Sequence, residues 1–394
     1  MVLARGDIMR PGNKTTDAHD QVYKKLAKQL DDMPGGFPAT ESGVELRILR
    51  RLFTPEEAEL ALNLTIIPEE PDRIARRLRL PEDETAKRLE AMAMKGLIYR
   101  RPPKDGPPLY MATQFVIGIW EYHVNSLDKA LVRDMEEYIP RLLDVETWKK
   151  VPQLRTIPIG KSIPVEHAVM PYEEAEKLVR SHKRILVAPC ICRRERKMVG
   201  EGCSRPEESC LVFGSGADFY LENGLGRMIS QEEALRILEE ADRAGLVLQP
   251  NNAQKAGNIC CCCGCCCGVL RTIKKYPRPA DIVSSAFRVS VDRDSCDGCG
   301  VCLERCQMEA LQLKDDRVSA DLGRCIGCGL CVTTCPTHSL TLERKPASEQ
   351  PAVPETMMKT YIKLARTRGK LKPSRLLNMW LKTKRPARAR TSGR

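Results

Sequence analysis

Apolar residues in the first third of the chain recur at helical spacing. Val22, Leu26 and Leu30 would share one face of a helix, which predicts that residues 17–30 are helical. Further helical patterns are followed by a pair of short strands. The predicted helices cover residues 44–52, 56–62, 72–78 and 81–95, and the predicted strands cover 97–100 and 109–111. This region should be a helical unit closed by a hairpin.

Helices followed by two strands are the order of a winged helix-turn-helix. Residues 74–101, IARRLRLPEDETAKRLEAMAMKGLIYRR, resemble the winged-helix domains of bacterial regulators. The resemblance implies a basic surface for DNA, namely Arg73, Arg76, Arg77, Arg79, Lys87 and Arg88. Acidic residues are interleaved with these bases and dilute their charge. DNA is therefore a partner that we do not favour, and docking against protein is the preferred use.

A second pattern begins near residue 145. Residues 115–143 are predicted to form a linking helix. Beyond it, helices and buried strands alternate, with helices at 173–180 and 231–244 and strands at 185–188 and 246–248. The strand at 185–188 leads directly into Cys190. The pattern indicates a mixed α/β domain.

Cysteines carry the candidate chemistry of the chain. It has 19 of them in 394 residues, and no apolar leader precedes them, so metal-bound thiolates are expected rather than a disulfide scaffold. An internal repeat contains eight: residues 289–313 and 318–342 align without a gap, with 11 identities in 25 positions. Each half carries the spacing C-x2-C-x2-C-x3-C. Close spacing lets thiolates converge on one small cluster.

These two runs resemble the bacterial two-cluster ferredoxin family, in which the fourth cysteine of each run ligates the other cluster. The resemblance implies one [4Fe–4S] cluster on Cys296, Cys299, Cys302 and Cys335, and a second on Cys325, Cys328, Cys331 and Cys306. The family's proline after the fourth cysteine is present as Pro336, but Gln307 stands in the first run. Two zinc sites are the alternative that this spacing disfavours.

The remaining cysteines lie in the middle of the chain. The order PCICRRE, then NICCCCGCCC, then a ferredoxin repeat looks like uncharacterised iron–sulfur proteins of anaerobic bacteria and archaea. Candidate metal ligands are Cys190, Cys192, Cys203, Cys210, Cys260, Cys262, Cys263, Cys266 and Cys267. Neighbouring bases such as Arg193 would favour their thiolates. We expect a third iron–sulfur cluster here, with zinc or redox-active thiols as alternatives.

The fold class that follows is a multidomain α+β protein. Its expected parts are an N-terminal segment (1–40), a winged-helix-like domain with its linker helix (41–144), a cysteine-rich α/β middle domain (145–280), a bacterial ferredoxin-like module (285–345) and a basic tail (346–394).

The net charge of +12 is concentrated in the tail. Residues 356–394 contain 13 Lys or Arg and no Asp or Glu, so the rest of the chain sums to 12 − 13 = −1. With its apolar residues, the tail is expected either to bind an acidic partner or a membrane surface, or to stay disordered. No run of apolar residues is long enough for a membrane span, and a cytoplasmic location is expected.

The preferred function is electron transfer through the paired clusters, between a site in the middle domain and external redox partner proteins of an anaerobic metabolism. One alternative is an iron–sulfur regulator that uses the winged helix on DNA. The other is an oxidoreductase with catalysis in the middle domain. The sequence identifies no catalytic residue and no oligomeric state.

Overall fold

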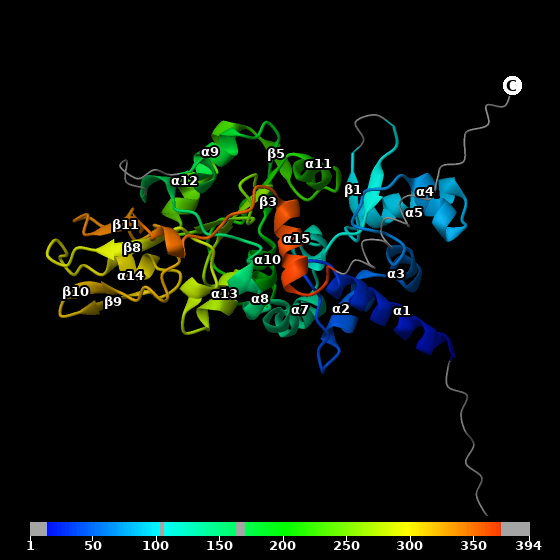
Figure 1. Ribbon diagram of the computed structural model, residues 1–394, viewed down its shortest axis with the longest axis horizontal. Helices are drawn as coiled ribbons and strands as arrows, with labels where there is room; N and C mark the ends of the chain where they lie inside the picture. Colours follow the sequence, from blue (N-terminus) through cyan, green and yellow to red (C-terminus); the bar gives the residue numbers. More distant parts are fainter. Residues whose placement is uncertain (1–13, 103–105, 163–169, 372–394) are drawn as a thin grey trace, which may run out of the picture.

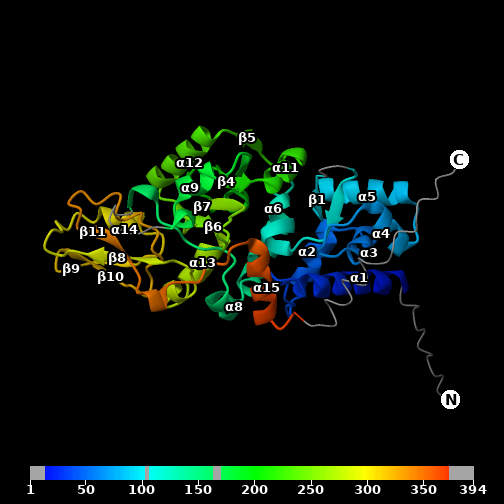
Figure 2. The same ribbon diagram turned by 45° about the horizontal axis from the view of Figure 1, so that its top comes forward.

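The computed structural model describes residues 14–102, 106–162 and 170–371 (Figure 1). Three parts follow one another along its longest axis, with the N-terminal helices at one end, a five-stranded sheet in the middle and the cysteine repeat at the other end (Figures 1 and 2). The predicted mixture of helices and sheets is confirmed. Among the described residues, no helix is long and apolar enough to cross a membrane.

The N-terminal part consists of five helices and a hairpin. The elements are α1 (Lys14–Asp31), α2 (Val44–Leu52), α3 (Pro55–Ala61), α4 (Pro71–Leu78), α5 (Glu82–Met94), β1 (Tyr99–Arg101) and β2 (Leu109–Met111). Thr54 and Glu57 form a capping box that starts α3, which satisfies backbone N–H groups at its first turn. The strands pair antiparallel, with Tyr99 opposite Met111. These elements follow the predicted order, and membership of the winged-helix class stays a prediction.

The prediction of one linking helix over residues 115–143 is wrong. Val116 and Ile117 have extended backbone, and only α6 (Trp120–Tyr122) and α7 (Lys129–Leu142) are helical. The Asp128 side chain accepts two backbone N–H bonds at the start of α7 and thereby begins a separate helix. In the segment that precedes α7, tertiary contacts outweigh the helical pattern of the sequence, because Phe115 is buried in an aromatic cluster with Phe37.

The middle sheet has the strand order β5-β3-β4-β7-β6, and all neighbours are antiparallel. Its strands are β3 (Ile185–Pro189), β4 (Glu208–Phe213), β5 (Arg227–Ile229), β6 (Val247–Pro250) and β7 (Asn258–Cys262). The helices around it are α8 (Val145–Lys150), α9 (Ala175–Arg180), α10 (Ile191–Met198), α11 (Ser215–Glu222), α12 (Gln231–Arg243) and α13 (Gly268–Lys274).

The two faces of this sheet join different hydrophobic cores. Ile185 and Val187 of β3 point to the core that contains α9 and α12. Leu186 and Ala188 point to the opposite core, which also contains Phe115 and the N-terminal helices. Alternation along a strand explains this division. The N-terminal part therefore packs directly on the cysteine-bearing sheet.

The cysteine repeat folds into two small antiparallel ladders. β8 (Phe287–Val291) pairs with β11 (Leu340–Arg344), and β9 (Leu311–Lys314) pairs with β10 (Arg317–Ala320). The short helix α14 (Val301–Arg305) lies between β8 and β9. The first strand thus pairs with the last, so the two halves of the repeat are interlocked.

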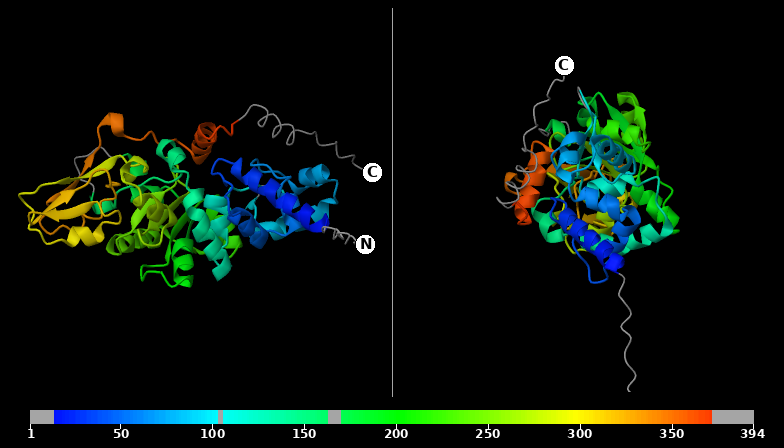
Figure 3. Two further views of the ribbon diagram at one scale, coloured as in Figure 1. Left: turned by 90° about the horizontal axis from the view of Figure 1, so that it is seen from below. Right: turned by 90° about the vertical axis from the view of Figure 1, so that its right-hand side faces the viewer.

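The beginning of the basic tail is folded, so the disorder that was one of the two expectations does not apply to it, and binding to an acidic partner or a membrane surface stays a prediction. Helix α15 (Met357–Thr367) lies across the junction of the N-terminal and middle parts (Figures 1 and 3). The Arg368 guanidinium donates to Asp31, and the buried Thr360 hydroxyl donates to the backbone of Asn252. Its bases therefore neutralise acidic groups of the same chain. The rest of the tail, residues 372–394, which contains the apolar residue Trp380, lies outside the described residues.

Candidate metal centre

The repeat brings its eight cysteines together in two sets. The electrostatic neighbours of Cys302 include Cys335, Cys299 and Cys296. Those of Cys331 are, largest first, Cys328, Cys325 and Cys306, followed by Cys302 of the first set. In both sets the fourth cysteine comes from the other half of the repeat. This is the grouping implied by the ferredoxin resemblance, and the ligand assignment itself stays a prediction.

Backbone N–H groups point at the sulfurs in matching positions of the two halves. Val318 donates to Cys296 Sγ and Val289 donates to Cys325 Sγ, each at 3.4 Å. Ala310 donates to Cys306 Sγ at 3.2 Å. Hydrogen bonds to cluster sulfurs stabilise negative charge and are one of the factors that set a cluster's potential. The residues present therefore fit two [4Fe–4S] clusters, which would supply one-electron chemistry here.

Gln307, which replaces the family's proline, connects the repeat to the middle domain. It is buried, and its Oε1 accepts the backbone N–H of Gly264 at 2.7 Å. A Cβ on Gly264 would collide with the carbonyl oxygen of Gln307, so only glycine permits this approach. Proline at this position could not make the side-chain hydrogen bond. The contact places Cys306 next to the cysteine-rich loop that contains Gly264.

The middle cysteines form two separate groups. The outer group consists of Cys203, Cys263, Cys265 and Cys266, whose sulfurs all lie within 4.8 Å of one another. Three of these were candidates from the sequence, and Cys265 was missed. It lies in a loop, where strand alternation gives no guide to direction. The nine candidates therefore do not surround a single site.

The spacing of the outer group fits a single metal ion. Its measured sulfur-to-sulfur distances are 4.0, 3.9 and 3.6 Å. A tetrahedral ion with bonds of about 2.3 Å to sulfur requires a separation of about 3.8 Å. A cubane holds four iron atoms inside its ligands and needs wider separations. Within the described residues, the eight repeat cysteines do not gather this tightly.

Charge favours ligation at part of the outer group. Arg205 donates from its guanidinium to Cys265 Sγ at 3.4 Å. Burial raises the pKa of Cys203, but the backbone N–H of Arg205 and the other thiols of the group outweigh it and lower that pKa to about 6. Burial instead raises the pKa of Cys263 to about 11 and also raises the pKa of Cys266. Cys203 is therefore the member present as a thiolate, the form that binds metal, at neutral pH.

The inner group consists of Cys190, Cys192, Cys210, Cys260, Cys262 and Cys267. The backbone explains why they meet: Cys210 of β4 lies directly opposite Cys260 of β7, and Cys262 follows on the same face of β7. Cys261 points to the opposite face of β7, the face that Leu211 of β4 also presents. Cys190 precedes α10, and Cys267 precedes α13.

The pKa values of the six inner thiols depend on one another in one continuous series. Along it the order is Cys190, Cys192, Cys267, Cys262, Cys260 and Cys210. Interaction with Cys192 lowers the pKa of Cys190, and interactions with Cys210 and Cys262 lower the pKa of Cys260. Interactions with Cys190 and Cys267 raise the pKa of Cys192. The group therefore shares negative charge among its sulfurs.

Arg193 lies between the inner and outer groups. It is completely buried, and it donates to the carbonyl oxygens of Pro206 and Cys261 at 2.9 and 2.8 Å. Burial lowers its pKa, but the sulfurs of Cys190 and Cys263 raise it above the usual value. No carboxylate of the described chain forms a recorded ion pair with this guanidinium. The cysteines of both groups supply its counter-charge.

Two carboxyl groups border the inner group, and sequence reasoning missed both. Burial, together with smaller contributions from Cys260 and Cys190, raises the pKa of Glu121 to about 8. Glu195 is buried, and neither of its carboxylate oxygens has a hydrogen-bond partner among the described residues. Burial, followed by Glu136, raises the pKa of Glu195 above its usual value. No local motif marks either residue.

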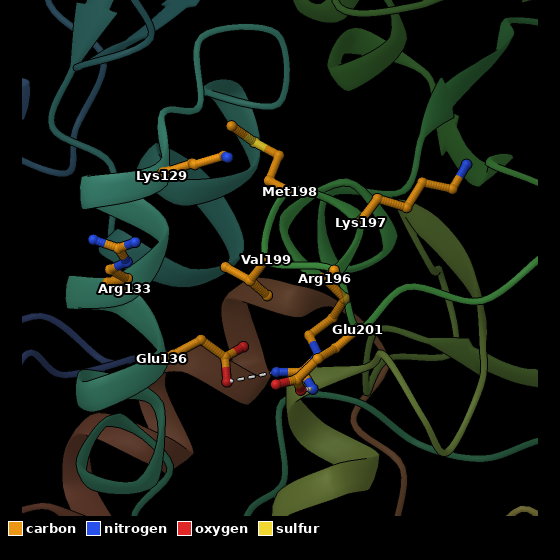
Figure 4. Close-up of a pocket in the computed structure, with 9 residues that line it drawn as sticks. Lys129, Arg133, Glu136, Arg196, Lys197, Met198, Val199 and Glu201 are labelled. Carbon is orange, nitrogen blue, oxygen red and sulfur yellow. Dashed lines mark hydrogen bonds and ion pairs between the residues drawn. The ribbon is translucent and has the colours of Figure 1, made fainter.

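A basic pocket of about 660 Å³ lies beside α10 but contains no cysteine in its described lining (Figure 4). Glu136 faces Arg196 across it and pairs with that guanidinium at 3.0 Å. Glu136 also pairs with Arg271. The pocket is therefore separate from the thiol groups.

Comparison with known proteins identifies one part of the chain. Residues 295–339 match the family model described as a 4Fe-4S dicluster domain. No curated protein and no solved structure matches the chain. The cysteine repeat is thus an iron–sulfur domain of the ferredoxin type, and the match together with the many cysteines indicates an iron–sulfur protein that carries electrons.

Proposed function

We propose that this chain transfers electrons between an external redox protein and its own middle domain, through two [4Fe–4S] clusters in residues 285–345. The observation that carries the proposal is the contact between Gln307 and Gly264. It sets Cys306, an expected ligand of the second cluster, beside the loop of the outer group. A relay needs such adjacency between successive centres.

The exposure of the repeat cysteines gives the relay a direction. Cys299, an expected ligand of the first cluster, is exposed. Both sets also contain buried cysteines, namely Cys296 and Cys302 in the first and Cys325 in the second. In the second set, which has no exposed member, the carbonyl oxygen of Cys328 accepts the N–H of Ile159 from the middle part at 3.0 Å. The first cluster would therefore meet the external partner, and the second would face the middle domain.

The middle domain is the receiving end of this relay. Its outer group would hold a single ion, as the spacing of the four sulfurs favours. This departs from the cluster that we expected there from the sequence. Iron there could accept an electron, whereas zinc has no redox chemistry and would serve only the structure. Because Gln307 contacts Gly264 in the loop of the outer group, an ion in that group would hold the loop against the repeat and fix the middle domain relative to it.

An oxidoreductase with catalysis in the middle domain is the second candidate. It is supported by Glu121 and Tyr361, which keep part of their surface accessible although burial raises their pKa values to about 8 and about 12. Such side chains border an internal space rather than open solvent. Glu121 would hold a proton there, close to the inner thiols.

The regulator alternative is less favoured. Arg100, in the strand pair that would form the wing, is buried and pairs with Glu90 and with Glu222 of α11. Arg76 and Arg88 pair with acidic residues one helical turn away. Much of the basic surface is thus neutralised within the chain, and docking onto the middle part is the use that these contacts support.

The experiment is a measurement of iron, acid-labile sulfide and zinc on protein purified without oxygen, combined with EPR during stepwise reduction. The repeat should contribute about eight iron and eight sulfide, with magnetic interaction between two adjacent reduced clusters. In the Cys325→Ser variant, external donors should still reduce the first cluster but no centre in the middle domain. Near-zero iron, or undisturbed reduction of the middle domain in that variant, would contradict the relay.

A further inference from the structure

The inner group is a second metal-binding arrangement that is separate from the outer group. We propose that it holds a multinuclear iron–sulfur cluster, in addition to the ion of the outer group and the two clusters of the repeat. This inference deepens the proposed function, because the inner cluster would be the end of the relay. Its own test is metal content, which does not depend on electron flow.

Convergence from distant segments is the first support. The six thiols come from the start of α10 and the residue before it, from β4, from β7 and from the residue before α13. Four separate chain segments deliver sulfur to one place, and the register of β4 and β7 fixes two of them face to face. The same register turns Cys261 to the other face of β7, away from Cys260 and Cys262.

The number and spread of the thiols favour several metal ions over a single zinc ion. Zinc in structural sites takes four ligands in a tight tetrahedron. The inner group offers six thiols, and in the described residues only the outer group meets the tight spacing. Several metal ions bridged by sulfide can use thiolates that are spread in this way.

Four of the six thiols are not fully enclosed by protein atoms. Cys190, Cys192, Cys210 and Cys260 keep an intermediate share of accessible surface, although burial desolvates each of them. Sulfur ligands of this kind are suited to a soft metal centre.

Charge and unsatisfied polar groups are the third support. The buried guanidinium of Arg193 faces both thiol groups, and a buried cation needs an anionic partner. On the other side of Cys190 and Cys267, Glu195 is close enough to interact with both, although its oxygens lack hydrogen-bond partners. An unpaired buried carboxyl costs free energy unless a further group completes its surroundings. An anionic cluster with sulfide bridges would satisfy Arg193.

The test compares two neighbouring residues of β7, in full-length protein prepared without oxygen. Cys262→Ala removes a thiol that contacts two others of the inner group, whereas Cys261→Ala removes one from the opposite face. Cys262→Ala should lose about four iron and four sulfide per chain and keep the EPR signals of the repeat. Cys261→Ala should keep the wild-type content. A third variant, Cys266→Ala, should lose only the ion of the outer group.

Two outcomes would overturn the inference. One is a wild-type chain with only about eight iron, because the repeat alone would account for them. This measurement needs no variant and holds even if Cys262→Ala fails to fold. The other is disulfide bonding among the inner cysteines in the wild-type protein, detected by mass spectrometry after alkylation with and without prior reduction. A full iron content with slow electron transfer would instead refute the relay and leave the inner cluster standing.

Discussion

Removing the side chain of Gln307 tests how the iron–sulfur domain is held to the middle part. Gln307→Ala leaves the buried N–H of Gly264 without its 2.7 Å acceptor. An unsatisfied buried donor costs about 1–3 kcal/mol. Loss of one buried methylene adds about 0.8 kcal/mol. The variant should therefore lose about 2–4 kcal/mol of stability at this contact.

The assay is anaerobic unfolding in urea, followed by the visible absorbance of the clusters. With a slope of about 3 kcal/mol/M, a loss of about 3 kcal/mol moves the midpoint down by about 1 M. Gln307→Pro, which restores the family's residue, should lose the same hydrogen bond and fall by a similar amount. Gln312 is exposed on β9 of the same domain, so Gln312→Ala is the control and should change little.

Equal midpoints for Gln307→Ala and Gln312→Ala would refute the reasoning. They would mean that the contact with Gly264 contributes nothing to holding the domain in place. The proposed relay would then lose the observation on which it rests.

Further predictions concern the same contact and the tail helix. Gly264→Ala should lower the unfolding midpoint, because its Cβ meets the backbone carbonyl oxygen of Gln307, whereas Gly257→Ala, with its nearest atom at 3.6 Å, should not. Asp31→Asn should speed hydrogen exchange in α15 about tenfold, since it removes charged partners of Arg368 and Lys370. Burial raises the pKa of Asp31, but those two bases outweigh it and hold the pKa below 3.8. The contribution of Asp31 is therefore complete at neutral pH and is lost as the pH falls below 3.8, which exchange measured across acid pH would detect.

The sequence predicted those helices and strands that depend on the order of neighbouring residues. The helices from residue 44 to 95 and the strands around the cysteine repeat follow from spacing, capping residues and alternation. The repeat itself indicated an iron–sulfur domain, which the family match over residues 295–339 supports. In these segments, neighbours in sequence decide the structure.

The division of the middle cysteines could not be predicted in the same way. Which thiols meet depends on the pairing of β4 with β7, and that register is set by contacts 50 residues apart, such as Cys210 with Cys260. The direction of Cys265 depends on a loop. Glu121 follows a segment whose helical pattern was overridden by aromatic packing around Phe115. Each of these is a tertiary effect that periodicity does not contain.

The hydrophobic core that joins the N-terminal helices to β3 and β4 has a thermodynamic consequence. Phe219 of α11 packs against Tyr99 of the hairpin and Tyr122 of α6, so the two parts share buried apolar surface. Whatever binds to the sheet and stabilises it also raises the free energy needed to unfold the helices. Because such coupling is mutual, a partner that binds the helices changes the affinity of the sheet for its metal. Metal binding at the sheet would therefore change the stability of the N-terminal helices, and partner binding at the helices would change metal affinity.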